Sequence, residues 1–131
     1  MGKKPSDRHP HGQRHAASDR LVRQFFLGFV RTHILFHAAE KPVCGVGLSE
    51  ELARHGYRLS PGTLYPTLHG LEEAGYLRCV PEVQDGRVRK HYRITADGRW
   101  ALEQVRKQIA ELVEEVMSNE THATQGNRSK T

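Results

Sequence analysis

Apolar residues recur at helical spacing in the stretch 59–77, which reads LSPGTLYPTLHGLEEAGYL. Leu64, Leu68 and Leu71 stand at i, i+4 and i+7, so they form one stripe along a helix. The opposite face of this helix is small, polar or aromatic. Gly75 is expected to end the helix, because glycine favours the position after a helix C-terminus. The pattern predicts a helix that packs on a core through its leucines and leaves its other face for a groove.

The start of this helix has two interpretations. Ser60 and Pro61 form a capping residue followed by a proline at the first helical position. That start would leave Pro66 in the helix interior, where proline removes a backbone hydrogen bond. A turn at Pro61-Gly62 would instead let the helix begin near Thr63 and would place Pro66 close to the first turn. We expect the second start.

Two more helices are predicted before this stretch. Apolar residues between Asp19 and Ala39 wrap most of a helical circumference, so this helix should be buried on two sides. The segment Gly47–His55 is a short amphipathic helix that Gly56 closes. A short helix joined by a brief turn to the stretch 59–77 is the pattern of a helix-turn-helix.

A basic hairpin follows the helix-turn-helix. Tyr76–Val83 and Lys90–Thr95 are predicted as its strands, and the link between them contains Asp85-Gly86, a pair that favours a tight reversal. The cations of the returning strand are Arg87, Arg89, Lys90 and Arg93. The expected fold class is α+β, mainly helical: a winged helix-turn-helix over 19–95 with a long C-terminal dimerisation helix over 96–117.

The C-terminal helix should begin after Thr95, with Asp97 favourable in its first turn. Its narrow apolar seam repeats at alternating steps of three and four. The seam residues are Leu102, Val105, Ile109, Leu112 and Val116. Together with Phe25 and Phe29 of the first helix, they are the predicted interface of a homodimer. The alternative is a helix that packs only on its own domain.

Composition agrees with a nucleic-acid partner. The 131 residues carry a formal net charge of +5, which favours an anionic partner. The polar segments 1–18 and 118–131 are expected to be a disordered basic arm and a disordered tail; the arm is either solvated or touches DNA phosphate. Two cysteines without a disulfide framework, no signal peptide and no run long enough to span a bilayer predict a cytoplasmic protein.

The run Gly62-Thr63-Leu64-Tyr65-Pro66, followed by Arg89-Lys90-His91-Tyr92, resembles the PadR family of bacterial winged-helix transcriptional regulators over about residues 26–98. The resemblance implies a dimeric repressor on a pseudo-palindromic duplex, released by a small-molecule effector or another stimulus. It also implies a recognition helix in the major groove and a wing on phosphates or the minor groove. Departures are Val46, where the family often has Tyr, and Val88, where it often has Pro. The candidate DNA-binding residues are Ser60, Thr63, Tyr65, Pro66, His69, Arg87, Arg89 and Lys90.

The sequence contains no constellation typical of an enzyme, and no cofactor is expected. No metal site is expected; His33 and His37 stand at i and i+4 without an HExxH glutamate and are the candidate metal ligands. Two alternatives to a simple DNA-binding repressor remain. One is a regulator in which these histidines, Cys44 or Cys79 sense a metal ion or an oxidant. The other is a winged helix that binds only proteins. Trp100 either packs in the core or at an interface, or it is a platform for a flat ligand.

Overall fold

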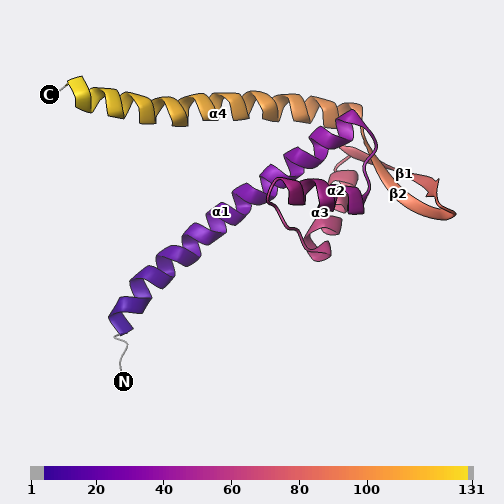
Figure 1. The fold of residues 1–131 in the computed structure, drawn as a ribbon, viewed down its shortest axis with the longest axis horizontal. Coiled ribbons are helices and arrows are strands. Elements are labelled where there is room, and N and C mark those ends of the chain that lie inside the picture. The colour runs from indigo at the N-terminus through magenta and orange to yellow at the C-terminus, as the bar shows by residue number, and fades with distance from the viewer. Residues whose placement is uncertain (1–4, 130–131) are drawn as a thin grey trace.

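Within residues 5–129, which the computed structural model describes, the chain forms four helices and one antiparallel hairpin (Figure 1). Side chains are described for residues 19–118. The elements in chain order are α1 (Pro5–Glu40), α2 (Gly45–Arg54), α3 (Pro61–Glu73), β1 (Leu77–Gln84), β2 (Arg87–Ile94) and α4 (Ala96–Ser129). This mainly helical α+β arrangement, with a hairpin after two short helices, confirms the predicted fold class.

The core lies where α1, α2, α3 and the base of the hairpin meet. The leucine stripe predicted from spacing is buried: Leu64, Leu68 and Leu71 all face inward. They join Ile34 of α1, which is fully buried, and Leu52 of α2. Burying each such side chain is worth about 1.5–3 kcal/mol, so the stripe explains how α3 is held while its other face stays free.

The predicted stops of the two short helices are confirmed. After α3, the amide of Gly75 donates to the Glu72 carbonyl and that of Tyr76 to the Leu71 carbonyl, which is the Schellman pattern. Gly56 and the following residue make the same pair of bonds after α2. At the other end of α2, Cys44 is the N-cap, and its Sγ accepts from the Gly47 amide at 3.4 Å.

The expected start of α3 near Thr63 is wrong. The helix begins at Pro61 with Ser60 in the extended N-cap conformation, and Pro66 lies inside it. Pro66 and Gly62, whose carbonyl loses its partner, are both on the exposed face. Since solvent can satisfy an exposed carbonyl, an interior proline costs less here than it would in a buried helix.

The hairpin is longer and its turn tighter than predicted. The strands pair from Leu77 opposite Ile94 to Gln84 opposite Arg87, so the link is the pair Asp85-Gly86 alone. Both turn residues have positive φ, 52° and 74°, as a two-residue type I′ turn requires. A short bridge between Val43 and Tyr92, with N–O distances of 3.0 and 2.7 Å, adds a third extended segment at the base.

Both long helices extend beyond their predicted bounds. α1 begins at Pro5 rather than Asp19, and α4 ends at Ser129 rather than near residue 117. The structure therefore differs from the disordered arm and tail that composition suggested; residues 1–4 and 130–131 of those segments lie outside the described residues. Composition shows that these segments cannot build a core, but a helix that is already nucleated gains a hydrogen bond with each further residue. Figure 1 shows the two helices diverging from the helix-turn-helix.

The start of α4 agrees with its predicted cap. Thr95 Oγ1 accepts from the Gly98 amide at 3.0 Å and donates to the Gly75 carbonyl at 2.6 Å.

Among the described residues, no helix has a stretch that is both long and apolar enough to pass through a bilayer.

Candidate nucleic-acid interface

Tyr65 lies on the outer face of the recognition helix and is packed against α2. Its side chain is 40% exposed. A Cβ added at Gly45 would lie 2.7 Å from the Tyr65 ring, so the absence of a side chain at residue 45 makes room for the ring. The tyrosine is thus exposed on one side and held on the other, which limits the orientations it can present to a base edge.

Hydroxyl groups cluster at the N-terminal end of α3. Ser60 makes no capping bond to a backbone amide; its hydroxyl donates instead to Thr63 Oγ1 at 3.3 Å. Thr63 is half-buried, and its carbonyl accepts from Thr67 Oγ1 at 2.6 Å. Pro66 and His69 are exposed. All the predicted positions on this helix are therefore at the surface, with Thr63 the least accessible.

The strand register divides the cations of the wing between two faces. Because side chains alternate along a strand, Arg87 and Arg89 share a face with Arg93, whereas Lys90 lies on the face of Tyr92. Arg93 is paired with Glu82 at 3.8 Å. Among the side chains of residues 19–118, no ion pair involves Arg87, Arg89 or Lys90. Their charges are exposed and available to an anion.

One surface cleft brings the recognition helix and the wing together. It has a volume of about 360 Å³, and its lining includes Tyr65, His69, Arg89 and Lys90. Tyr92 also lines the cleft, and its burial, followed by nearby Cys79, raises the pKa of its phenol above the ordinary value. Ser60, Thr63 and Arg87 are outside this lining, nearer the ends of their elements. The cleft thus combines an aromatic ring, an imidazole and two cations beside the exposed face of a helix.

Comparisons with known proteins show which proteins this chain is similar to. Residues 34–104 match the model of the transcriptional regulator PadR-like family. The chain is 52% identical over 106 residues to the transcriptional regulator Rv3488 of Mycobacterium tuberculosis, covering 81% of this chain and 98% of that protein. The chain belongs to the PadR-like family of transcriptional regulators. The predicted resemblance is therefore confirmed, and so is the prediction of a DNA-binding regulator rather than an enzyme or a purely protein-binding module.

Solved structures of other PadR-like proteins have the same fold. A PadR-like transcriptional regulator from Bacillus cereus matches with a TM-score of 0.64 and 30% identity, covering 73% of this chain and 94% of that one. A PadR-like transcription factor from Bacteroides fragilis matches with a TM-score of 0.65 and 26% identity, over 74% of this chain and 95% of that one.

The apolar seam of this PadR-like regulator is divided between core and surface. Leu102, predicted at the dimer interface, is only 7% exposed and belongs to the chain's own core, because the first turns of α4 pack against α1 and β2. Phe29 is half-buried, with its ring 5.1 Å from that of Tyr57. Val105 is also half-buried. The large apolar side chains left exposed include Phe25, Trp100, Ile109, Leu112 and Val116.

Trp100 of this regulator does not pack in its own core. Its side chain is 67% exposed at the start of α4. This exposure excludes core packing, whereas packing at an interface and a platform for a flat ligand both stay predictions.

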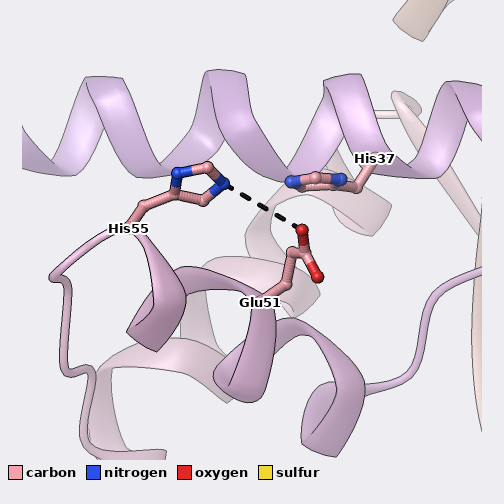
Figure 2. A group of neighbouring side chains, drawn as sticks. All are labelled: His37, Glu51 and His55. Carbon is pink, nitrogen blue, oxygen red and sulfur yellow. Dashed lines mark ion pairs between the residues drawn. The ribbon is translucent and has the colours of Figure 1, made fainter.

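The predicted His33–His37 pair lies in a larger group of side chains. His37 of α1 lies beside Glu51 of α2 and His55, the C-cap residue of that helix (Figure 2). The ring of His33 is 5.4 Å from that of His55, and burial, followed by the charges of His55 and His37, lowers the pKa of His33. Sequence reasoning missed Glu51 and His55, although their i, i+4 spacing on a predicted helix was a usable signal.

Neither cysteine joins this group among the described side chains. Cys44 caps α2, and the Cys79 amide donates to Glu72 Oε2 at 3.2 Å.

Proposed function

We propose that this PadR-like regulator binds a pseudo-palindromic operator as a two-fold homodimer, and that it represses transcription until an effector releases it. The observation that carries the proposal is the cleft in which Tyr65 and His69 of α3 meet Arg89 and Lys90 of the wing. A helix face of this kind suits a major groove, and adjacent cations suit the phosphates that flank it.

The proposed dimer is supported by apolar side chains on both long helices. Phe25 of α1 is 64% exposed, and Ile109, Leu112 and Val116 of α4 are about half exposed. Large apolar side chains left in solvent in this number often mark a surface that a partner covers. Two copies that bury these faces would carry two recognition helices related by a two-fold axis, which requires an operator with two half-sites.

Two kinds of DNA contact are proposed within each half-site. Tyr65 and Thr63, with Ser60, Pro66 and His69 beside them, would meet base edges, since a hydroxyl and a ring edge can contact bases or a thymine methyl. Arg87, Arg89 and Lys90 would meet phosphates or a narrow minor groove, and would supply affinity more than sequence choice. The exposure of Arg87, Arg89 and Lys90 supports this division, and none of the three has an ion-pair partner among the described side chains.

Repression and release by an effector rest on the family resemblance. The exposed Trp100 beside the proposed interface is a candidate platform for a small aromatic effector. A cytoplasmic location is part of the same proposal, because a DNA-binding regulator with two free cysteines fits a reducing compartment.

The test is selection of duplexes from a random library with the purified protein, followed by measurement of the number of chains bound to each selected duplex. We expect enrichment of an inverted repeat with half-site centres about one helical turn apart. Two chains should bind each duplex, and scrambling one half-site should abolish that stoichiometry. Enrichment of a single unrepeated site bound by one chain would contradict the two-fold model.

A further inference from the structure

Three side chains of metal-binding type converge from α1 and α2 (Figure 2). His37 lies near the C-terminal end of α1, Glu51 lies on α2, and His55 caps the C-terminus of α2. One nitrogen or oxygen from each lies within 4.8 Å of the others. Glu51 and His55 stand at i and i+4, so both project from the same side of α2. The packing of α2 against α1 therefore assembles a group that neither helix contains alone.

We propose that His37, Glu51 and His55 bind a divalent transition-metal ion of the Zn²⁺ type, which ties α2 to α1. Two imidazole nitrogens and a carboxylate oxygen suit zinc, cobalt or nickel, whereas Mg²⁺ and Ca²⁺ prefer oxygen ligands alone. With bonds of about 2.0–2.2 Å, tetrahedral ligand atoms lie about 3.4 Å apart. The three ligand atoms, which lie within 4.8 Å of one another, would have to move closer to that spacing when an ion binds.

The carboxylate is already oriented for this role. Arg54 Nη1 donates to Glu51 Oε2 at 2.9 Å, while Glu51 Oε1 faces His55 Nε2 at 4.0 Å. An outer partner that holds one carboxylate oxygen leaves the other directed at the ion, as in known metal sites. The three ligands leave at least one coordination position for water or another group.

An ion can reach the group from solvent. The side chain of His55 is 51% exposed and that of Glu51 34%. His37 and Glu51 also line a surface cleft of about 400 Å³. The neighbouring His33 Nδ1 is buried and has no hydrogen-bond partner among the described residues. Ring packing on Phe29 and Tyr57 accounts for the position of His33, but such packing does not account for a carboxylate placed between His37 and His55.

The site has a regulatory consequence that rests on the proposed function. α1 carries part of the proposed dimer surface, and α2 is the first helix of the helix-turn-helix. An ion that joins α1 and α2 restricts the movement of the helix-turn-helix relative to the proposed dimer surface. The metal ion is then an effector of DNA binding, which departs from the sequence expectation that no metal or cofactor is bound.

The first experiment measures metal binding without DNA. Metal-free, untagged full-length protein is titrated with ZnCl₂ against a chromophoric chelator. We expect one site per chain that MgCl₂ does not occupy. His55→Ala and Glu51→Gln should each weaken Zn²⁺ binding by at least ~10-fold, the loss seen when even an outer partner of a metal ligand is removed. The visible spectrum with Co²⁺ should lose its protein-bound bands in both variants.

Matched controls separate this site from other histidines. His69→Ala removes an exposed imidazole on α3, and the triple variant His9→Ala, His11→Ala, His15→Ala removes the N-terminal ones; both should bind Zn²⁺ as the wild type does. His55 is exposed and Glu51→Gln keeps the side-chain shape, so circular dichroism should show folded variants. Equal Zn²⁺ affinity in the wild type, His55→Ala and Glu51→Gln, or loss in the triple variant alone, overturns the site.

The second experiment measures the coupling to DNA. A duplex selected with the metal-free protein is titrated in saturating ZnCl₂ and in EDTA. Affinity should change by about fivefold or more in the wild type, the usual lower range of allosteric coupling, and not in His55→Ala. By linkage, the duplex should change the Zn²⁺ affinity by the same factor. Unchanged duplex affinity overturns the regulatory role. A protein that binds Zn²⁺ as expected but enriches no duplex contradicts the proposed function instead.

Discussion

At the residue scale, Gly98 in the first turn of α4 has less room for a side chain than any other described glycine. A Cβ there would collide with the backbone carbonyl oxygen of Tyr76 and would lie 2.7 Å from Ile94 Cγ1. The Gly98 amide also donates to the cap residue Thr95. Glycine at residue 98 therefore allows the start of α4 to pack against the end of β2 and the segment before β1.

We predict that Gly98→Ala lowers the free energy of unfolding by about 1–3 kcal/mol, the usual cost of overpacking, because a backbone carbonyl cannot swing aside as a side chain can. Denaturant titration followed by circular dichroism measures the change. Gly70→Ala is the matched control. Gly70 is likewise in a helix but is exposed, and an added Cβ there meets nothing within 4 Å. The control should be as stable as the wild type or more so; equal stability of the two variants would contradict the prediction.

At the scale of elements, the recognition helix and the wing meet at one cleft but are held differently. The Tyr65 ring rests against Gly45 of α2. Arg87 and Arg89 instead project from a two-stranded hairpin, and no ion pair among the described side chains neutralises their charges. A ring held by packing presents a fixed contact, which suits reading. Long cationic side chains on a hairpin can adjust to the phosphates of the DNA backbone, which suits contacts that position the protein without reading sequence.

We predict that Tyr65→Ala lowers affinity for the selected duplex while leaving affinity for random DNA nearly unchanged, since base contacts carry sequence discrimination. Fluorescence anisotropy with both duplexes measures the specificity ratio. Tyr65→Phe keeps the ring on Gly45 and removes only the hydroxyl, so it shows which part of the side chain reads. An equal loss on both DNAs in Tyr65→Ala would make Tyr65 a packing residue and not a reader.

The wing should behave in the opposite way. Arg87→Ala and Arg89→Ala should weaken binding to both DNAs, and each lost phosphate contact should flatten the dependence of log affinity on log salt by about one unit. Arg106→Ala, an exposed arginine on α4, controls for the change in net charge. A wild-type salt slope in both wing variants would show that these arginines do not meet phosphate.

At the scale of the whole molecule, α1 and α4 extend away from the winged domain (Figure 1). Both helices leave large apolar side chains exposed to solvent. Burial of each large apolar side chain is worth about 1.5–3 kcal/mol, and part of that gain is offset by the entropy lost on association. The proposed dimer would therefore depend on a few residues such as Ile109, which is 43% exposed.

We predict that Ile109→Glu converts a dimer into a monomer at micromolar concentration, because a charge at this position would have to be buried without a partner. Sedimentation velocity measures the change. Gln108→Glu adds the same charge at the neighbouring exposed position, off the seam, and should stay dimeric. A monomeric wild type, or a dimer of Ile109→Glu as tight as the wild type, would refute the assigned interface.

The sequence by itself determined the features that depend on nearby residues. The stripe Leu64, Leu68, Leu71 followed from helical spacing, and the stops at Gly56 and Gly75 followed from bonds that close within one turn. Asp85-Gly86 predicted the reversal for the same reason, although not the length of the strands. The run 62–66 and the wing cations carried the family resemblance, so the candidate DNA-binding face was also readable from sequence.

Only the tertiary structure decided which surfaces face each other. Spacing assigned Leu102 and Ile109 to one seam, but the first is buried by α1 and β2 while the second remains in solvent. Spacing likewise paired His33 with His37, whereas packing places Glu51 and His55 of α2 beside His37. Periodicity reports the faces of one helix; it holds no information on which face of another helix lies opposite, because that depends on how the whole core packs.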